Sequence, residues 1–556
     1  MVLTELLGAA GWLHPVPLAI AWVAILLATA WRLRNVKVRR PRAGAVEWAI
    51  AAACGGIVAV VAAAAILSPP NSADAMTYHL PRVIYWAQAG SVGFFPTPYF
   101  NQVMLSPAAE YLVLHTYLLT GGDRLVNLIA CGAFTGCIVA VSAVAREMGL
   151  GTRSQAVAAL VCATLPNAIL QGSGAKNDML LSLWVVCAIY FALRRETVWL
   201  GLAVGLALAT KATAYLFLPP LLLGVGVRRR RDLMWIAAGV LLLNGPQFVR
   251  NAKLTGSPLG YDSAHGDGRF RWRNERLGWQ ALVSNALRNG SEQLGARSQR
   301  WNNTVYSTVM EAHRTLGLDA NDPGTTWPGS RFEPPRNANH EANANNRWHL
   351  ALILAAAIWA MVRRERRWMA YAAGLASAFL LLCLYLKWQP FLARLELPLF
   401  VAAVPLAAWL VDRWRPAWLS LALCVFLVSG VRLPLFENWT RPLKGEHSLW
   451  TSRRDDDYFR DIGQWNNKAS YLEAVERVAQ SGCGLVGIDI SENQLEYPFQ
   501  ALLRERRPGV RFVHTEAGGS PCAVLCMDCI LNQEKIAKYA VVGTPIEIGR
   551  FLLFLK

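Results

Sequence analysis

Residues 45–68 read AVEWAIAAACGGIVAVVAAAAILS, and PPNSADAMTYHLPR follows directly at residues 69–82. The first stretch is apolar and long enough to cross roughly 30 Å of hydrocarbon as a helix. The second stretch places Asp74, His79 and Arg82 just outside that span. A carboxylate at the mouth of a helix bundle can take a proton from an acceptor while the protein shields it from water. The two stretches together predict a membrane protein with chemistry at the membrane face.

The composition of the whole chain supports a membrane setting. Hydrophobic residues make up 54% of the 556 residues, and further apolar runs recur between residues 16 and 433. The formal net charge of +18 could suit a nucleic-acid-binding protein, but the basic residues lie in short clusters between the apolar runs. That pattern is typical of cytoplasmic loops. We therefore expect a polytopic α-helical membrane protein that has no nucleic-acid partner.

Basic clusters occupy every second loop between the apolar runs. They consist of Arg32, Arg34, Lys37, Arg39, Arg40 and Arg42; Arg146 and Arg153; Arg194 and Arg195; Arg228–Arg231; Arg363–Arg367, with Glu365 among them; and Arg413 with Arg415. Placing these loops in the cytoplasm puts both termini outside and predicts about twelve spans. The spans lie near residues 16–32, 45–68, 125–146, 154–171, 179–194, 197–211, 213–227, 233–249, 348–362, 368–386, 394–411 and 417–433.

Three segments fall outside the bilayer on the side away from the basic loops. Residues 69–124 contain two amphipathic helices, around 77–89 and 107–120, which we expect to lie in the membrane interface with Tyr85 and Trp86 as anchors. Residues 250–347 are rich in Asn, Arg, Gly and Trp and predict a loop with short helices that covers the site. The hydropathy then drops, which divides the chain into a membrane domain at 1–433 and a soluble domain at 434–556.

The soluble domain alternates strand-like and helix-like segments. Strands are predicted at 485–490, 510–514, 523–527 and, as a final pair, around 538–542 and 546–555, with a helix at 497–506. The domain is therefore expected to be a small α/β module. It contains Cys483, Cys522, Cys526 and Cys529, and four cysteines in an exported domain favour one or two disulfides over a zinc site. The pairing cannot be read from the sequence.

Charged and polar residues gather at the outer ends of several spans. Lys176, Asn177 and Asp178 follow the fourth span, Lys211 ends the sixth, Arg250 ends the eighth, and Lys387 and Arg394 lie between the tenth and eleventh. Charges so close to hydrocarbon are costly unless they face a cavity or a partner. Each residue taken alone could equally be an interfacial side chain that reaches toward water. Their shared position beside Asp74 favours a common polar site.

The order of these parts resembles the GT-C superfamily of membrane glycosyltransferases, above all family 39/83-like bacterial members related to protein mannosyltransferases and aminoarabinose transferases. The resemblance covers about residues 45–435. Its first motif, around Asp74, is also similar to that of an uncharacterised bacterial subgroup of the superfamily. The resemblance therefore indicates a reaction class and not a substrate. The motifs that carry it are Asp74 with Tyr78-His79-Leu80-Pro81-Arg82; Gly122-Asp-Arg-Leu-Val-Asn127; Ala175-Lys-Asn-Asp178; Gly205-Leu-Ala-Leu-Ala-Thr-Lys211; Gly245-Pro246, Arg250-Asn251 and Gly256-Ser-Pro258; and Ala393-Arg-Leu-Glu-Leu-Pro398.

The resemblance implies an inverting transfer of a sugar from a polyprenyl-phosphate donor to an acceptor hydroxyl, on the outer face of the bacterial cytoplasmic membrane. It implies that Asp74 is the general base, although an Asp at this position could instead cap the helix at 77–89. The residues that would contact substrate are His79, Arg82, Glu110, Lys176, Asn177 and Asp178. A salt bridge from Asp178 to Lys176 or Lys211 is the alternative role for that acid.

The donor leaves as a lipid phosphate whose negative charge grows as the glycosidic bond breaks, so nearby cations stabilise the transition state. Lys211, Arg250 and Arg394 are the candidates for holding this phosphate. The acceptor could be a glycan, a lipid-linked glycan or a protein.

The first outer loop departs from the family pattern at one point. Asp74 is followed by Ala75 where relatives commonly have two adjacent acids, and the loop contains no Asp-x-Asp motif. A divalent cation needs several oxygen ligands, so we expect neither a metal nor another cofactor.

Two other classes of function remain open from the sequence. A polytopic transporter or lipid or glycan flippase also combines many spans with buried charges, and an inactive scaffold could use the outer domain to recruit partners.

Overall fold

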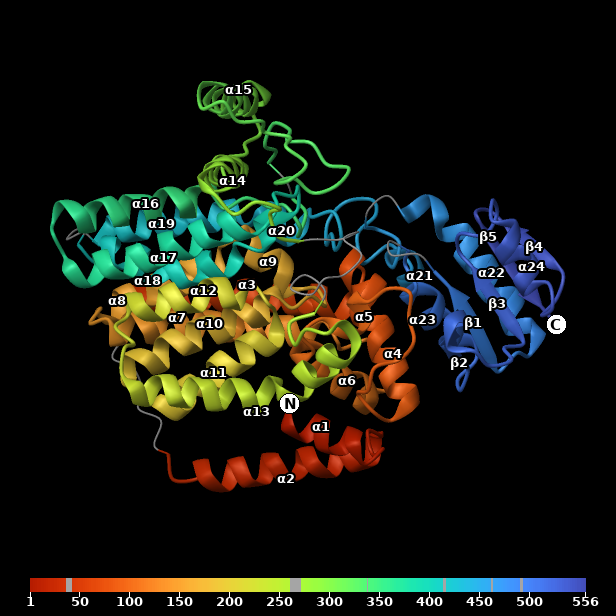
Figure 1. Ribbon diagram of the computed structural model, residues 1–556. Coiled ribbons are helices and arrows are strands. Elements are labelled where there is room, and N and C mark those ends of the chain that lie inside the picture. The colour runs from red at the N-terminus through yellow and green to blue at the C-terminus, as the bar shows by residue number, and fades with distance from the viewer. Residues whose placement is uncertain (37–42, 261–271, 338, 414–416, 462–463, 491–493) are drawn as a thin grey trace.

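The computed structural model describes the chain except residues 37–42, 261–271, 338, 414–416, 462–463 and 491–493. Each span predicted from the sequence contains a helix; the helix of the first span lies apart along one side of a bundle that the other helices form (Figure 1). The helices of the spans are α2 (Pro15–Leu33), α3 (Ala45–Leu67), α7 (Leu128–Glu147), α8 (Thr152–Ala163) with α9 (Pro166–Gly172), α10 (Asp178–Arg194), α11 (Thr197–Thr210), α12 (Ala214–Gly224), α13 (Arg230–Thr255), α16 (Arg347–Val362), α17 (Arg366–Tyr385), α18 (Leu397–Asp412) and α19 (Ala417–Gly430).

The lengths of these helices differ more than the apolar runs suggest. Within the described residues, six helices are long and apolar enough to cross a membrane, and the pair α8–α9 makes a seventh if it is one span. That pair bends by 66°. Pro166 starts α9 and holds the preceding Leu165 in an extended conformation, which ends α8. The predicted α-helical polytopic fold is confirmed, with several spans shorter than a full crossing.

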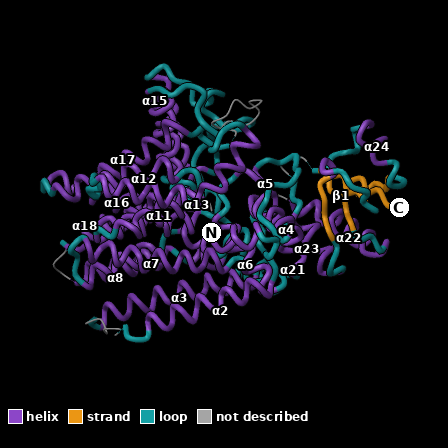
Figure 2. The backbone as a smooth tube through the Cα atoms, turned by 60° about the horizontal axis from the view of Figure 1, so that its bottom comes forward, coloured by secondary structure: helices purple, strands orange, loops and turns teal. Residues whose placement is uncertain are grey.

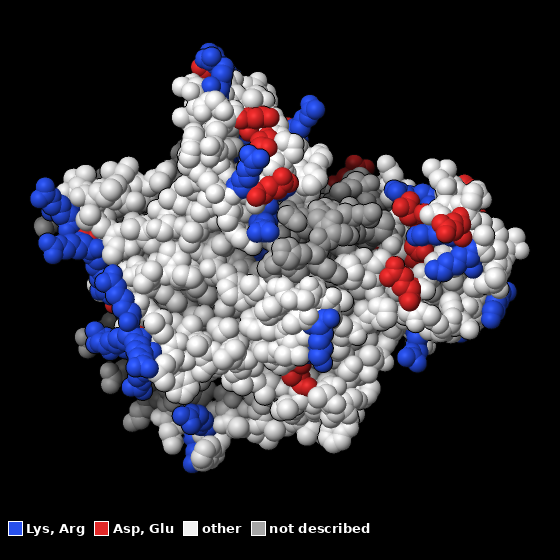
Figure 3. Space-filling model, in the orientation of Figure 1, with Lys and Arg blue, Asp and Glu red and all other residues white. Residues whose placement is uncertain are grey.

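The two ends of the bundle differ in charge. Figure 3 shows a band of Lys and Arg at the left end of the bundle, whereas the C-terminal domain lies at the right end. The helix that starts the chain, α1 (Val2–Ala9), lies at the outer end of α13, since Glu5 pairs with Arg250 there. Five residues of the predicted basic clusters lie outside the described residues: Lys37, Arg39, Arg40, Arg42 and Arg415.

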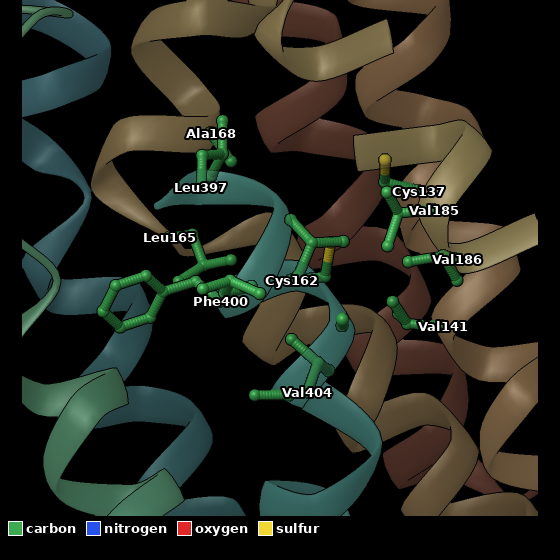
Figure 4. Close-up of a cluster of buried hydrophobic side chains, with 14 of the residues drawn as sticks. Cys137, Val141, Cys162, Leu165, Ala168, Val185, Val186, Leu397, Phe400 and Val404 are labelled. Carbon is green, nitrogen blue, oxygen red and sulfur yellow. The ribbon is translucent and has the colours of Figure 1, made fainter. Parts of the chain in front are cut away.

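The core of the bundle is packed by small and branched side chains. Figure 4 shows Cys137, Val141, Val185 and Phe400 among buried residues from α7, α8, α10 and α18. The cysteines of the spans that lie in this cluster are buried thiols and behave as small apolar side chains.

The first outer segment contains helices at both predicted positions, around 77–89 and 107–120, but the surroundings of the first helix differ from the prediction. It contains a π-helical turn at Ala75–His79, then α4 (Leu80–Ala89), α5 (Asn101–Met104) and α6 (Ala108–Thr120). The assignment of Tyr85 and Trp86 as membrane anchors was wrong, because their residues are 7% and 2% exposed. The Tyr85 hydroxyl donates to Glu496 at 2.5 Å and the Trp86 indole to the Gly93 carbonyl. The C-terminal domain covers Tyr85, and Gly93 and Tyr111 of the same segment cover Trp86, so neither side chain faces lipid.

The second outer segment contains longer helices than expected. Its helices are α14 (Trp279–Glu292) and α15 (Gln299–Thr315), and α15 projects from the bundle (Figure 1). A later stretch, 339–346, returns to the outer end of the bundle, where Gln171 of α9 donates to the Glu341 carbonyl at 2.8 Å. Two short helices, α20 (Arg432–Phe436) and α21 (Arg454–Asp457), lead to the C-terminal domain.

The C-terminal domain is an α/β module, as predicted, at one end of the molecule (Figure 2). Its sheet has the order β2-β1-β3-β5-β4, with β1, β2 and β3 parallel and β5 antiparallel to β3 and β4. The elements are α22 (Lys468–Ser481), β1 (Leu485–Asp489), α23 (Tyr497–Arg506), β2 (Arg511–His514), β3 (Ala523–Cys526), α24 (Gln533–Tyr539), β4 (Pro545–Ile548) and β5 (Phe551–Leu555). Disulfides join Cys483 to Cys522 and Cys526 to Cys529.

One strand prediction in this domain was wrong. Residues 538–542 contain the end of α24 and a turn, and the final pair of strands is a hairpin within the stretch predicted as one strand. Gly549 makes this hairpin possible because its φ of 58° suits a glycine in a tight turn.

Candidate active site

Asp74 lies at the end of the bundle near the C-terminal domain and contacts Arg394. An Nη1 hydrogen of Arg394, from a short 3-10 turn before α18, is donated to Oδ2 of Asp74 at 2.5 Å. The Asp74 side chain is 21% exposed and that of Arg394 is 9% exposed. Asp74 precedes the π-helical turn, but its side chain makes no capping hydrogen bond. The carboxylate is therefore directed to a cation and not to the backbone of the helix that follows.

A second ion pair joins α10 to the end of α11. Asp178, at the start of α10, accepts from the Nζ of Lys211 at 2.5 Å, and Asn177 donates to the Thr210 carbonyl at 3.2 Å. Lys211 adopts an extended backbone that ends α11, so its side chain turns into the site. This contact is the salt bridge that the sequence left as the alternative role for Asp178.

Lys176 belongs to a buried group that the sequence did not reveal. Its Nζ lies 2.9 Å from Oε1 of Glu341, and Glu341 also pairs with Arg441. Arg441 donates in addition to Ser173 and to Asn71, three residues before Asp74. No local pattern marks Glu341 or Arg441 as site residues, because each stands in a polar loop far from Asp74 in sequence.

His340 and Asp461 form a hydrogen-bonded pair next to the backbone that carries Asp74. Oδ1 of Asp461 lies 2.7 Å from Nε2 of His340, and Oδ2 accepts from the backbone N–H of Ala73 at 2.7 Å. The Ala342 N–H donates to Nδ1 of His340, which favours the tautomer with the proton on Nε2. Asp461 thus holds the backbone next to Asp74. Neither residue stands in a recognisable motif.

The cations of the site set the ionisation of Asp74. Burial alone would raise the pKa of this carboxyl, but Arg394, Lys176, His79 and Lys211 outweigh burial and lower it well below its usual range. Burial, reinforced by Arg394, lowers the pKa of Lys176 to about 8 even though Asp74, Asp461 and Asp178 oppose the shift. Asp74 is therefore a carboxylate near neutral pH, whereas Lys176 loses its proton at moderately alkaline pH.

His79, Arg82 and Glu110 form a second network, at the start of α4, which is linked to Asp74 through His79. His79 contacts Glu110 at 2.7 Å through Nδ1, and Arg82 reaches the same carboxylate at 3.3 Å. Arg82 is 1% exposed and also donates to backbone carbonyls, among them that of Leu105. The pKa of Glu110 is lowered because His79 and Arg82 outweigh its burial. These contacts give Arg82 and Glu110 a packing role in the first outer segment.

Arg250 is placed with α1 and not with Asp74. Its guanidinium binds Glu5 through two hydrogen bonds of 2.9 and 2.7 Å and contacts the Tyr111 hydroxyl. Glu5 was absent from the predicted site because it precedes the first apolar run. A glutamate in a short amphipathic helix gives no sequence signal for such a contact.

The residues around Asp74 do not form an evident metal site. In the part of the chain that the structure describes, the group of His, Cys, Asp or Glu ligand atoms close enough to share an ion is Asp489 with Cys526 and Cys529, in the C-terminal domain. Asp74 and Asp178 each contact a cation instead. Metal independence of the Asp74 site stays a prediction.

Comparison with known proteins identifies the architecture. No family model matches this chain, and no curated protein matches its sequence. Among solved structures, ArnT from Cupriavidus metallidurans bound to undecaprenyl phosphate is similar, with 14% identity, a TM-score of 0.53, and coverage of 92% of this chain and 98% of that one. The chain has the fold of ArnT.

Two further structures complete the comparison. ArnT in the apo state gives 12% identity and a TM-score of 0.51 over the same shares of the two chains. Archaeal oligosaccharyltransferase AglB from Archaeoglobus fulgidus, in complex with an inhibitory peptide and a dolichol-phosphate, gives 11% identity and a TM-score of 0.44, covering 88% of this chain and 71% of that chain. The similarity to ArnT includes nearly the whole of that protein, so it confirms the GT-C-like fold that the sequence motifs implied.

Proposed function

We propose that this protein is an inverting glycosyltransferase that moves a sugar from a polyprenyl-phosphate donor to an acceptor hydroxyl. The observation that carries the proposal is the buried charge cluster of Asp74, Arg394, Lys176, Lys211 and Asp178 at one end of a bundle with the ArnT fold. The cluster combines a carboxylate that can accept a proton with cations that can receive a phosphate.

Arg394 is the residue best suited to the donor phosphate. Its Nη1 binds Asp74, but its buried Nε has no partner among the described residues. A buried N–H group without a partner is costly, and a phosphate oxygen would satisfy it. The guanidinium can bind phosphate and carboxylate with different N–H groups, so Arg394 would join the donor to Asp74.

Donor binding would also change the strength of the base. While Arg394 holds Asp74, the carboxylate binds a proton weakly. When the phosphate takes up part of the charge of Arg394 and Lys211, the affinity of Asp74 for a proton rises. Asp74 would then remove the proton from the acceptor hydroxyl as the hydroxyl attacks the anomeric carbon and the lipid phosphate leaves. The cations stabilise that leaving group most when its charge is greatest.

The charge distribution supports a location for this reaction. The C-terminal domain lies at the end of the bundle away from the basic turns (Figure 3). The cluster lies at the same end, because Asp461 of the segment that leads to this domain binds the backbone beside Asp74. Because basic loops remain in the cytoplasm, the site would face the extracytoplasmic side of a bacterial cytoplasmic membrane. The sugar and the acceptor, whether a glycan, a lipid-linked glycan or a protein, depend on contacts outside this cluster.

The Asp74→Asn substitution tests the assigned base. We expect purified Asp74→Asn protein in lipid nanodiscs to release undecaprenyl phosphate from a panel of undecaprenyl-phosphate sugars at least ~100-fold more slowly than the wild type. Thermal stabilisation by undecaprenyl phosphate should persist in this variant and be lost in Arg394→Ala. Asp322→Asn, in an exposed loop, is the matched control. Unchanged turnover in Asp74→Asn would refute the role of Asp74.

A further inference from the structure

The second cluster of reactive side chains lies in the C-terminal domain, far from Asp74 in sequence. Cys526 ends β3, Cys529 follows after two residues, and Asp489 ends the adjacent parallel strand β1. A carboxylate oxygen of Asp489 and the two sulfur atoms all lie within 4.8 Å of one another. The cluster consists of a C-x-x-C disulfide beside a buried acid.

The topology of the sheet places this cluster where α/β domains bind ligands. The connection from β1 leads to β2 on one side, and the chain then crosses to β3 on the other side of β1. The strand order therefore reverses between β1 and β3, and ligands bind outside the carboxyl ends of strands at such a point. Asp489 and Cys526 are the last residues of those two strands.

Asp489 is held in a position that suits proton transfer to sulfur. Its residue is 7% exposed, Lys535 donates to Oδ1 at 2.7 Å, and the Tyr539 hydroxyl donates to Oδ2. Both partners come from α24, which covers Cys526 and Cys529 with apolar side chains. Keeping a carboxylate desolvated beside a disulfide is costly, and here Lys535 and Tyr539 offset that cost by hydrogen bonding both of its oxygens.

The two disulfides of the C-terminal domain differ in how much they can stabilise it. Cys483 and Cys522 precede β1 and β3 and are separated by 39 residues, so their bond closes a long loop. Cys526 and Cys529 are separated by 3 residues. A bond that closes so short a loop restrains the unfolded chain much less. The Cys526–Cys529 bond therefore stabilises the domain less than the Cys483–Cys522 bond does. It is nevertheless the bond that lies beside the buried carboxylate of Asp489.

We propose that Cys526–Cys529 is a thiol–disulfide exchange site that a protein dithiol reduces. The partner's thiolate attacks Sγ of Cys529, the sulfur–sulfur bond breaks, and Cys526 leaves as a thiolate that takes a proton by way of Asp489. The partner's second thiolate then attacks the mixed disulfide and releases Cys529. Two electrons and two protons pass to this protein, and the partner becomes a disulfide. This inference is independent of the proposed function.

The approach of a partner is supported by the surface around the cluster. Asp528, between the two cysteines, is exposed, so the loop reaches the surface while its sulfur atoms face inward. Leu531 is 95% exposed and lies two residues after Cys529, and Val541 is 85% exposed and lies two residues after Tyr539. Exposed aliphatic side chains on both sides of α24 suit docking of another protein. Because Cys529 is buried, attack on its sulfur requires the Cys526–Cys529 loop to turn outward first.

The test measures both disulfides in one molecule. The full chain in nanodiscs is treated with reduced thioredoxin that is regenerated by its reductase, quenched with an alkylating reagent and analysed by peptide mass spectrometry. We expect Cys526–Cys529 to be reduced at least ~10-fold faster than Cys483–Cys522. Since Cys522 is partly exposed and Cys526 is fully buried, access alone would give the opposite order. Reduction of both bonds only when the domain unfolds would overturn the proposal.

A pair of aspartate variants tests the role of Asp489. Asp489→Asn should slow reduction of Cys526–Cys529 by ~10-fold, whereas Asp322→Asn, at an exposed position outside the C-terminal domain, should stay within about twofold of the wild type. Equal rates of Cys526–Cys529 reduction in the two variants would show that Asp489 takes no part in the exchange. Zinc content is measured on the reduced wild type, and one tightly held ion would overturn exchange in favour of a metal site formed by Asp489, Cys526 and Cys529.

Discussion

The positive charge of Lys176 is destabilised by burial and by the nearby Arg394. The residue is 6% exposed, and burial together with Arg394 lowers its pKa to about 8. The ammonium form is therefore present below about pH 8 and is lost as pH rises through that value. Loss of this charge weakens the pair with Glu341 and reduces the positive potential near Asp74. A site that binds a lipid phosphate should then bind it less well.

The pH dependence of donor use tests this residue. We expect kcat/KM for a polyprenyl-phosphate donor to fall by ~10-fold between pH 7 and pH 9, because the protonated fraction of Lys176 falls by that factor. Lys176→Arg keeps its charge over this range and should flatten the alkaline limb. Lys253→Arg, at an exposed position of α13, should keep the limb of the wild type. Identical profiles in wild type and Lys176→Arg would show that another group titrates.

At the scale of elements, α11 and α13 approach closely through glycines. Gly201 and Gly205 form a G-x-x-x-G pair on α11 and face Gly239 of α13. A Cβ on Gly239 would lie 2.2 Å from the Gly201 carbonyl oxygen, and a Cβ on Gly201 would lie 2.1 Å from that of Trp235. Small residues at such crossings allow close helix packing in membranes. This crossing fixes the position of α11, and Lys211 directly follows the last residue of that helix.

A bulky side chain at this crossing should separate the two helices. We expect Gly239→Leu to destabilise the protein by about 1–3 kcal/mol, as overpacking does, and to lower the thermal unfolding temperature in detergent. Donor binding should weaken as well because Lys211 would shift. Gly132→Ala, in α7, adds a Cβ with no atom within 4 Å and is the matched control. Equal unfolding temperatures for the two variants would show that the crossing tolerates expansion.

At the scale of the whole molecule, the C-terminal domain is joined to the first outer segment by buried carboxylates. Glu496 is 0% exposed and accepts from Tyr85 at 2.5 Å and from Gln102 at 2.7 Å. Asp123 accepts from Tyr458 and Tyr497 of the C-terminal part at 2.5 and 3.0 Å. The C-terminal part of the chain therefore fixes α4, α5 and the turn after α6, close to the π-helical turn that follows Asp74.

Removing one carboxylate should loosen the domain. We expect Glu496→Ala to cost about 1–3 kcal/mol, because the Tyr85 hydroxyl and the Gln102 amide lose a buried partner. Limited proteolysis between residues 437 and 467 should become faster, and sugar transfer should fall with it. Glu534→Ala, exposed on α24, should match the wild type in both measurements. Proteolysis at the wild-type rate in Glu496→Ala would mean that apolar contacts suffice for docking.

The sequence by itself determined the helical membrane fold, the α/β character of the C-terminal domain and the residues that form the charge cluster. Apolar runs and basic loops are local properties, so the helices between residues 16 and 433, and the position of Asp74 at the end of the bundle away from the basic loops, could be predicted from them. The sequence could also suggest that four cysteines form disulfides, although not which cysteines pair.

Only the tertiary structure decided how those residues combine. Arg394 reaches Asp74 across 320 residues, and Asp461 reaches the backbone beside it across 388 residues. Arg250, placed by the sequence with the same cluster, contacts Glu5 instead, and Tyr85 is covered by protein and not by lipid. The physical reason is that hydropathy acts residue by residue, whereas the partner of a buried charge depends on which distant segments pack together and exclude water.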